Sequence, residues 1–417
     1  MEEDDIESSL SGSSKYNDSQ QHHRRAPPPP PPQAVPYPKA PVNSGAPASQ
    51  LSSSSANNER DDEPTTATDS FGFYRPLSAS GSLPVHTSAA DGSRLRSREK
   101  KWVVMLKNWR DYMENKFPTV KRRCRKGIPP SIRGTAWKYL SGAVFQMEQG
   151  QNKHVFEMCR TEPGEPRWVE AISKDLHRQF PNHEMFARQG RFSTTAMCDL
   201  FELLKAWTVL HPEEGYSQLQ APLAAVLLMQ MPVKDAFYCF VQLGHKYLSD
   251  YFSAGLEGVQ MDGDILMELL KRKASPCYRH LVCYATVAPR NSFVVVQRRH
   301  EVDPILWMTD WFMCLFCRSL PWSTVLRVWD MFFCEGIKVI FKVAIVYVKI
   351  ALGTDELRRE YDDLHAIVMR LKNVPPEELD APVFIPKVLE QVVQDGELEA
   401  IHFQTFRRRQ LQFSKQP

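Results

Sequence analysis

The sequence predicts an all-α fold for most of the chain, preceded by an N-terminal region that is expected to be disordered. Residues 1–95 are rich in Ser, Pro, Asn and Asp, and large apolar side chains are sparse there. Such a segment cannot bury enough surface to offset the entropy lost on folding. From residue 96 onward, apolar residues recur every three or four positions, which indicates helices. The remaining roughly 320 residues suffice for one large helical domain with two lobes.

The first helices are predicted from apolar spacing and from proline and glycine. Near residue 97 an amphipathic helix begins, and its stripe consists of Trp102, Met105 or Leu106, Trp109 and Met113. Pro129 and Pro130 suit the entry of a second helix, because a proline in the first turn sacrifices no hydrogen bond. Gly142 is placed to stop that helix.

Further helices follow along the chain. One carries Ile172 and Leu176 on a single face and is limited by Pro181. A later helix is expected from Met197 to about His211, and others at 221–231, 234–248, 262–273, 303–318, 322–333 and 337–352. Thr354 can cap the next helix, whose stripe consists of Leu357, Tyr361, Leu364, Val368 and Leu371. A last helix is expected from residue 386 to residue 412.

Composition limits the class of protein. The formal net charge of +3 argues against a dedicated nucleic-acid binder, which carries a strong basic excess. Nine scattered cysteines indicate reduced thiols in the cytosol. Cys314 and Cys317 form the one motif-like pair, but no second pair follows at zinc spacing. Core packing is therefore the favoured interpretation of this pair over a metal or redox site.

Two biased segments leave alternatives open. The basic run Lys121–Lys126 fits a solvated face first, then a contact to an acidic partner or a membrane surface, and last nucleic acid. The proline run Pro27–Pro32 can form a polyproline helix that docks on an SH3 or WW groove, or it can act as a plain spacer.

Two short motifs carry the functional signal. The first is Ile172-x-x-Asp175-x-x-Arg178, and the second is Tyr216-x-Gln218. Arginine and glutamine are the side chains that complete phosphoryl transfer in a GTPase, by neutralising charge and orienting water. From spacing alone, Asp175 and Arg178 fit an ordinary helical ion pair, and Gln218 fits an ordinary loop residue. The motifs become informative only in their wider context.

That context resembles the TBC-domain family of Rab GTPase-activating proteins. GIPPSIRGTAWKYLSGA carries Arg133 and Trp137 in the places typical of the family's opening motif. ISKDLHRQFPNHEMF and GYSQLQAPLAAVLLM resemble the arginine-finger and glutamine-finger motifs, and LPWSTVLRVWDMFFCEG carries Trp329 and Asp330. The four stretches stand in the family's order across 125–350. The phrases KRRCRKGIP and YFSAGLEGVQMDG resemble one subgroup of this family.

The resemblance implies a domain plan and a set of sites. It implies a two-lobed TBC helical domain over 96–353 and a C-terminal helical extension over 354–417. Arg178 and Gln218 would be the arginine and glutamine fingers. The supporting or GTPase-contacting residues would be Asp175, Tyr216 and Ile172. The structural residues would be Arg133, Trp137, Trp329 and Asp330, where an Arg133–Asp330 contact is conceivable.

The resemblance also implies a function. The chain would accelerate GTP hydrolysis by a Rab in trans, without a reaction of its own, and would regulate vesicle traffic. It would bind no cofactor or metal itself, because it lacks a G-x-x-x-x-G-K-[ST] loop and GTP and magnesium belong to the Rab. It is expected in the cytoplasm and transiently at membranes that carry the Rab, with peripheral membrane association only through that partner, and with no nucleic-acid partner. The alternatives are a catalytically silent Rab-binding scaffold and an adaptor.

Two positions depart from the family pattern. Leu219 follows the glutamine finger where most members have glycine. The apolar segment Val282–Val296 stands where the flanking motifs are nearly contiguous in the family. We interpret it as a gene-model error, with a genuine excursion as the alternative.

Overall fold

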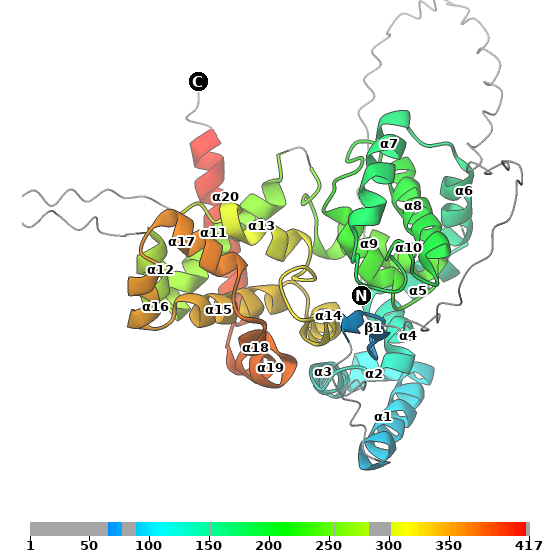
Figure 1. Cartoon of the computed structure of the whole chain (residues 1–417), viewed down its shortest axis with the longest axis horizontal. Helices are drawn as coiled ribbons and strands as arrows, with labels where there is room; N and C mark the ends of the chain where they lie inside the picture. Colours follow the sequence, from blue (N-terminus) through cyan, green and yellow to red (C-terminus); the bar gives the residue numbers. More distant parts are fainter. Residues whose placement is uncertain (1–65, 77–88, 151, 254, 283–301, 414–417) are drawn as a thin grey trace, which may run out of the picture. The chain divides into compact units, whose positions relative to one another are not determined.

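The computed structural model describes residues 66–76, 89–150, 152–253, 255–282 and 302–413. Within these ranges helices dominate, and the sheet has two short strands, so the predicted all-α fold is confirmed. Figure 1 shows the helices in two groups that meet at α14 (Trp322–Glu335). None of the helices in the described ranges combines the length and the apolar character that crossing a membrane requires.

The first group is built around one buried helix. All nine residues of α9 (Gln220–Leu228) are buried, and α9 packs against α8 (Ser193–Leu210) and α10 (Val233–Gln242). The helix predicted from residue 221 is therefore confirmed. The other helices of this group are α1 (Ala89–Lys107), α2 (Trp109–Asn115), α3 (Phe117–Arg125), α4 (Pro130–Ser141), α5 (Ala143–Glu148), α6 (Val155–Thr161) and α7 (Pro166–Asp175). Short turns of other helix types lie at Asn152–His154, Leu176–Arg178 (η2) and Leu243–Tyr247.

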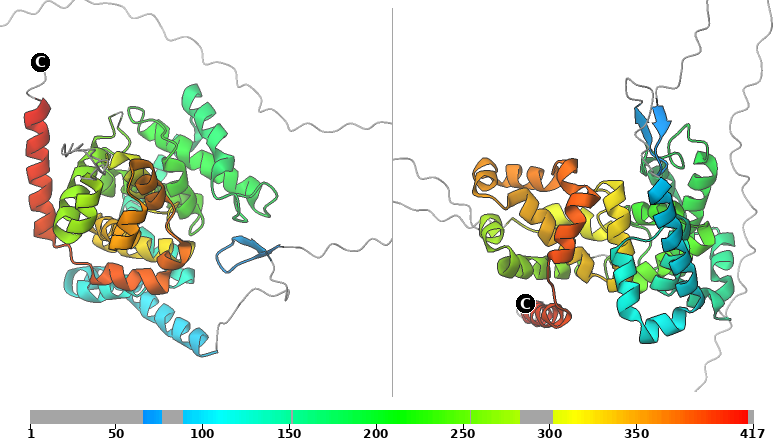
Figure 2. Two further views of the ribbon diagram at one scale, coloured as in Figure 1. Left: turned by 60° about the vertical axis from the view of Figure 1, so that its left-hand side comes forward. Right: turned by 90° about the horizontal axis from the view of Figure 1, so that it is seen from below.

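The second group surrounds α15 (Lys338–Leu352), which is buried along almost its whole length. It packs against α11 (Glu257–Lys273), α14 and α19 (Ala381–Glu390). The other helices of this group are α12 (Ser275–Val282), α13 (Ile305–Met313), α16 (Asp355–Glu360), α17 (Leu364–Lys372), α18 (Pro376–Leu379) and α20 (Asp395–Phe413). The right-hand view of Figure 2 shows the orange helices of this group on the opposite side of the molecule from the cyan and green helices of the first group. The two groups correspond to the two predicted lobes.

A buried carboxylate fastens α14 to the first group. Asp330 is fully buried and accepts hydrogen bonds from Arg133 Nε (3.1 Å), Trp137 Nε1 (2.9 Å) and the Ile128 backbone (2.6 Å). The Trp137 and Trp329 rings pack beside it, with centroids 5.5 Å apart. All four motif residues are buried, and the conceivable Arg133–Asp330 contact is present. Burial raises the pKa of Asp330, and its three donors oppose that effect.

Three predicted helices are each divided in two. The first one breaks at Asn108 between α1 and α2, which leaves Met113 exposed (37 %) although Trp102 and Trp109 are buried as predicted. The helix expected after Thr354 ends at Glu360, and α17 begins behind a new cap, where Asp363 accepts from the Ala366 backbone (2.8 Å). The last one divides into α19 and α20. Apolar periodicity continues across each break, so it did not reveal the divisions.

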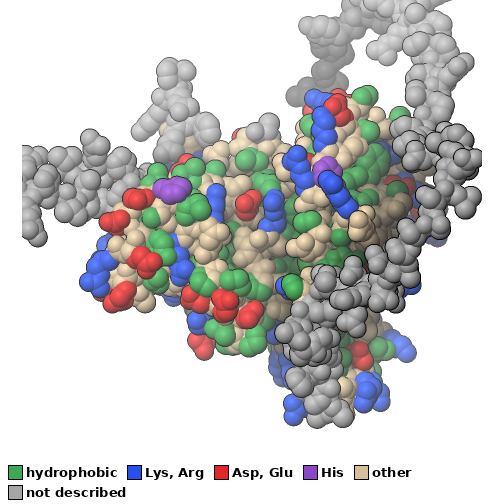
Figure 3. Space-filling model, in the orientation of Figure 1, with side chains coloured by type: hydrophobic (Ala, Val, Ile, Leu, Met, Phe, Trp, Pro, Cys, Tyr) green, Lys and Arg blue, Asp and Glu red, His purple; other side chains and the backbone are tan. Residues whose placement is uncertain are grey.

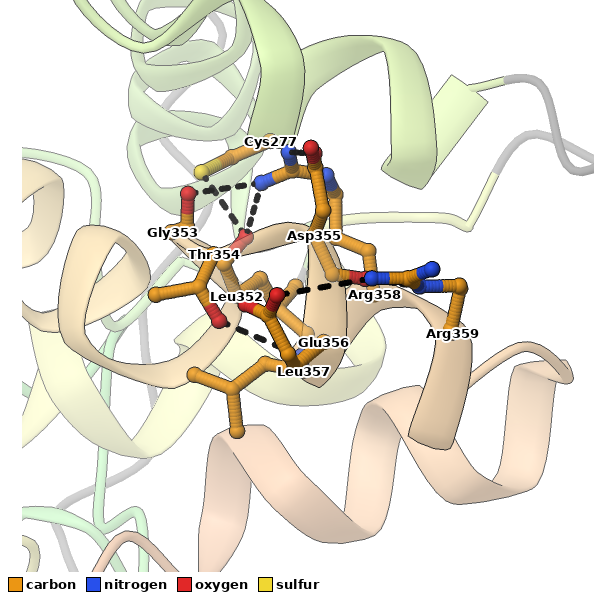
Figure 4. Close-up of polar contacts among 9 residues, drawn as sticks. All are labelled: Cys277, Leu352, Gly353, Thr354, Asp355, Glu356, Leu357, Arg358 and Arg359. Atoms are coloured by element: carbon orange, nitrogen blue, oxygen red, sulfur yellow. Dashed lines mark hydrogen bonds and ion pairs between the residues drawn. The ribbon is translucent and has the colours of Figure 1, made fainter.

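The junction of α15 and α16 shows how such a break is held. Thr354 caps α16 as predicted, because its hydroxyl accepts from the Leu357 backbone (3.2 Å). Arg358 reaches back and donates to the carbonyls of Leu352 (2.7 Å) and Gly353 (2.8 Å), which satisfies the end of α15 (Figure 4). The Cys277 thiol donates to the Leu352 carbonyl as well (3.4 Å).

The disorder predicted for residues 1–95 is wrong for 66–76 and 89–95. Thr66–Thr68 (β1) pairs antiparallel with Tyr74–Pro76 (β2), and α1 begins at Ala89. The Asp69 carboxylate forms the turn, since it accepts from the backbones of Phe71 (2.9 Å) and Phe73 (3.0 Å). The rest of 1–95, which includes Pro27–Pro32, lies outside the described residues. So does the Val282–Val296 segment from residue 283 onward.

Candidate functional site

Arg178 lies at the end of α7, where a single tight turn (η2) continues the helix. Its side chain is 59 % exposed, and Nη1 lies 3.4 Å from Asp175 Oδ1. Below it, Ile172 is fully buried and anchors α7 in the core. The Ile172 side chain thus lies inside the fold, beneath the segment that carries Arg178. The guanidinium keeps most of its five N–H donors available to an anion from outside.

Gln218 lies in the turn that leads into α9. Gly215 has φ +65°, and a Cβ at this position would collide with the indole of Trp168 on α7. The loop can thus pass directly over α7 only because this residue is glycine. Ser217 and Gln220 close the turn, since the Ser217 backbone donates to Gln220 Oε1 (3.2 Å) and the Gln220 backbone to the Ser217 carbonyl (2.9 Å). Gln218 itself is exposed, and its amide has no hydrogen-bond partner among the described residues.

Asp175 joins the two segments. Its Oδ1 faces Arg178, and its Oδ2 accepts a hydrogen bond of 3.0 Å from the Tyr216 hydroxyl. Both Asp175 and Tyr216 are 8 % exposed. Burial raises the pKa of Tyr216, and the Asp175 charge raises it further, so this phenol stays protonated and can donate. The sequence indicated that Asp175 can reach Arg178, but the contact with Tyr216 depends on the tertiary fold.

The segment after Arg178 is held by the N-terminal hairpin. Phe180 has φ +40°, an uncommon value for a residue with a side chain. Phe73 pairs with His183, the Tyr74 backbone donates to the Asn182 carbonyl (2.8 Å), and the Glu184 backbone donates to the Gly72 carbonyl (2.8 Å). The Phe73 ring also packs on Trp322, with centroids 5.3 Å apart. The sequence does not reveal this element, because three-residue strands in a polar region give almost no periodic signal.

The turn at Cys314–Cys317 supports the other segment from inside. Both cysteines lie in the core, as predicted, and Cys314 Sγ lies 3.8 Å from the Leu219 carbonyl. Leu315 (φ +47°) and Phe316 (φ +61°) both take left-handed conformations. Trp329 Nε1 donates to the Leu315 carbonyl (3.1 Å), which ties this turn to α14. Burial raises the pKa of the Cys317 thiol, so this thiol stays protonated at neutral pH.

Comparisons with known proteins identify several relatives. The family model described as Rab-GTPase-TBC domain matches residues 130–352. TBC1 domain family member 10B of Homo sapiens is 43 % identical over 352 residues, which cover 84 % of this chain and 41 % of that protein. TBC1 domain family member 10A of Mus musculus is 41 % identical over 370 residues, 87 % of this chain and 68 % of that protein. The subgroup indicated by the sequence phrases is thereby confirmed.

A solved structure supports the fold. The chain is similar to the crystal structure of the Chlamydomonas flagellar RabGAP TBC domain, with a TM-score of 0.55 and 22 % sequence identity. The match covers 78 % of this chain and all of that one. At this level of identity the similarity concerns the fold alone. The match to the human relative, in contrast, spans less than half of that protein's length.

Proposed function

Because this chain belongs to the Rab-GTPase-TBC domain family, we propose that it activates GTP hydrolysis by a small GTPase of the Rab type. Arg178 enters the partner's nucleotide site and spreads positive charge over the transferring phosphoryl group. Gln218 orients the attacking water. An arginine supplied in this way is worth roughly 10³–10⁵ in rate.

One observation carries this assignment: the Asp175 carboxylate contacts Arg178 and the Tyr216 hydroxyl at once. The arginine and glutamine segments are thus held by the same buried anchor, while the Arg178 side chain and Gln218 themselves stay exposed. An electrostatic catalyst works best when its charge is oriented before the partner arrives. The shared anchor supplies such orientation to both segments.

The same assignment fixes what the chain brings to the reaction. It contributes two side chains in trans, while GTP and magnesium are held by the GTPase, so it has no cofactor and no separate reaction. By speeding the return of the GTPase to its GDP state, it switches off a membrane-traffic signal. Its place of action is the cytoplasm and, transiently, the membranes that carry the GTPase.

The test is single-turnover GTP hydrolysis by a panel of Rab proteins, with the full chain and three variants. Arg178→Ala should lower the stimulated rate by about 10³-fold or more, and Gln218→Ala should lower it as well. Arg188→Ala is the matched control, because Arg188 is an exposed arginine ten residues further along and should leave the rate unchanged.

Two results would refute the proposal in different ways. A wild type that binds a Rab without accelerating any member of the panel would be a silent scaffold. If Arg178→Ala stimulates hydrolysis as strongly as the wild type, the chain is an activator that uses other residues.

A further inference from the structure

The positive charge of this chain is concentrated in one stretch. Residues 94–126 contain thirteen Lys and Arg against three Asp and Glu, a net charge of +10. The whole chain has a formal net charge of only +3, so the remainder is net negative. This stretch comprises most of α1 and all of α2 and α3. Figure 3 shows Lys and Arg side chains (blue) at the lower end of the view, where α1, α2 and α3 lie.

The stretch folds around a cavity of about 340 Å³ between α1 and the end of α3. The cavity, here called the basic pocket, is lined by Arg98, Lys101, Trp102, Arg122, Arg123 and Lys126. Five of these six side chains are cations, and none of the six is acidic. A hollow lined by one sign of charge concentrates the field and favours a compact ion of the opposite sign.

Two of the five cations are held in place without being neutralised. Arg98 Nη2 donates to the carbonyls of Lys126 (3.2 Å) and Gly127. Arg123 Nη1 donates to the carbonyl of Lys101 (2.6 Å). Backbone carbonyls fix the guanidinium groups but do not cancel their charge. In the described part of the chain, none of the five cations has a carboxylate within ion-pair distance.

The surface beside the basic pocket favours a membrane over other anionic partners. Val103 and Val104 on α1 are 43 % and 53 % exposed, and Val104 lies one turn from Lys101 and Lys107. Apolar side chains among cations are typical of helices that lie at a lipid interface. A single-stranded nucleic acid would need exposed aromatic rings for stacking, but the aromatic side chain of the pocket, Trp102, is 2 % exposed.

We propose that the basic pocket binds the phosphorylated headgroups of anionic lipids. The chain then attaches to a membrane through α1, α2 and α3, independently of any GTPase. Arg98 and Arg123 form the fixed floor of the site, while Lys101, Arg122 and Lys126, which are exposed, meet the phosphate groups. Val103 and Val104 enter the headgroup layer beside them.

The test is sedimentation of the full chain with vesicles. Three kinds are compared: phosphatidylcholine alone, phosphatidylcholine with phosphatidylserine, and phosphatidylcholine with a phosphatidylinositol bisphosphate. Binding to the two anionic kinds only is expected. Each Lys or Arg near an anionic surface contributes about fivefold in affinity, so the double variant Lys101→Ala/Arg122→Ala should bind about 30-fold more weakly.

The matched control is Lys372→Ala/Lys387→Ala, which removes the same charge from exposed positions on α17 and α19. It should bind almost as well as the wild type. Circular dichroism should show that both double variants are folded, since all four side chains are exposed. Stimulation of a soluble GTPase should be unchanged in both, which separates this test from that of Arg178.

Several results would overturn the proposal. The proposal fails if the two double variants bind the vesicles equally well. It also fails if the wild type does not bind anionic vesicles. Another such result is loss of soluble GTPase stimulation in Lys101→Ala/Arg122→Ala, which would place the pocket in the GTPase interface. Tighter binding of free inositol trisphosphate than of the vesicles would identify a soluble phosphate ligand, and tighter binding of an RNA oligonucleotide would identify a nucleic-acid site.

Discussion

Replacing Tyr216 by Phe tests the anchor that joins the two functional segments. The change removes one hydroxyl and leaves the ring, so the packing of the loop is kept. The lost contact is the 3.0 Å hydrogen bond to Asp175 Oδ2, between two groups that are each 8 % exposed. Hydrogen bonds to charged groups contribute about 1.5–3 kcal/mol. The free energy of unfolding should therefore fall by about 2 kcal/mol.

The effect on rate should be much smaller. Asp175 orients Arg178 through an ion pair of 3.4 Å to a guanidinium that is 59 % exposed. Exposed pairs of this kind contribute about 0.2–1 kcal/mol, which corresponds to at most about fivefold in rate. Tyr216→Phe should thus slow the stimulated hydrolysis by no more than about fivefold, whereas loss of Arg178 itself costs orders of magnitude.

Urea unfolding followed by tryptophan fluorescence measures the first quantity, and single-turnover hydrolysis measures the second. Tyr247→Phe is the matched control, because the Tyr247 hydroxyl donates to an uncharged acceptor, the Phe333 carbonyl (3.1 Å). It should cost about 0.5–1.5 kcal/mol and leave the rate unchanged. If Tyr216→Phe is no more destabilising than this control, the hydrogen bond to Asp175 is not the anchor described above. The reasoning is also refuted if Tyr216→Phe slows hydrolysis as strongly as Arg178→Ala.

Two further predictions concern other parts of the chain. Phe73→Ala should release the hairpin from residues 180–184. Hydrogen exchange at the Tyr74 and Glu184 amides should then rise, and stimulated hydrolysis should slow severalfold. The control Phe71→Ala should change neither, because the Phe71 side chain is exposed. Unchanged exchange in Phe73→Ala would contradict the docking. Burial raises the pKa of Asp262 from 3.8 to about 7, so folding takes up a proton between these values, and the free energy of unfolding should fall as pH rises from 4 to 7. This change amounts to at most about 4 kcal/mol, and it should be absent in Asp262→Asn when unfolding is measured by urea titration at several pH values. A variant whose pH profile matches that of the wild type would refute the raised pKa.

Much of the fold could be predicted from the sequence because it is encoded locally. Helices such as α4 and α9 are indicated by apolar spacing together with a proline in the first turn, and for α4 by the glycine that ends it. The break between α16 and α17 could not be predicted, because the apolar stripe continues across it. There the chain turns at Tyr361 and restarts on the Asp363 cap.

The candidate site divides in the same way. Arg178 and Gln218 could be named only through the resemblance of their motifs to the family, whereas helix spacing alone places Asp175 beside Arg178. The hairpin could not, since its Phe73 meets His183 across more than a hundred residues. Nor could the basic pocket: the sequence shows the run Lys121–Lys126, but Arg98 and Lys101 join it only through the packing of α1 beside α3.

The sequence by itself determined the helical class, because apolar spacing within a few residues indicates each helix. The resemblance of its ordered motifs to the family named Arg178 and Gln218. Only the tertiary structure decided which donors meet the two buried carboxylates. Tyr216 donates to Asp175, and Ile128, Arg133 and Trp137 donate to Asp330. A buried carboxylate needs several donors to offset its desolvation. Those donors come from distant parts of the chain, where no local pattern can indicate them.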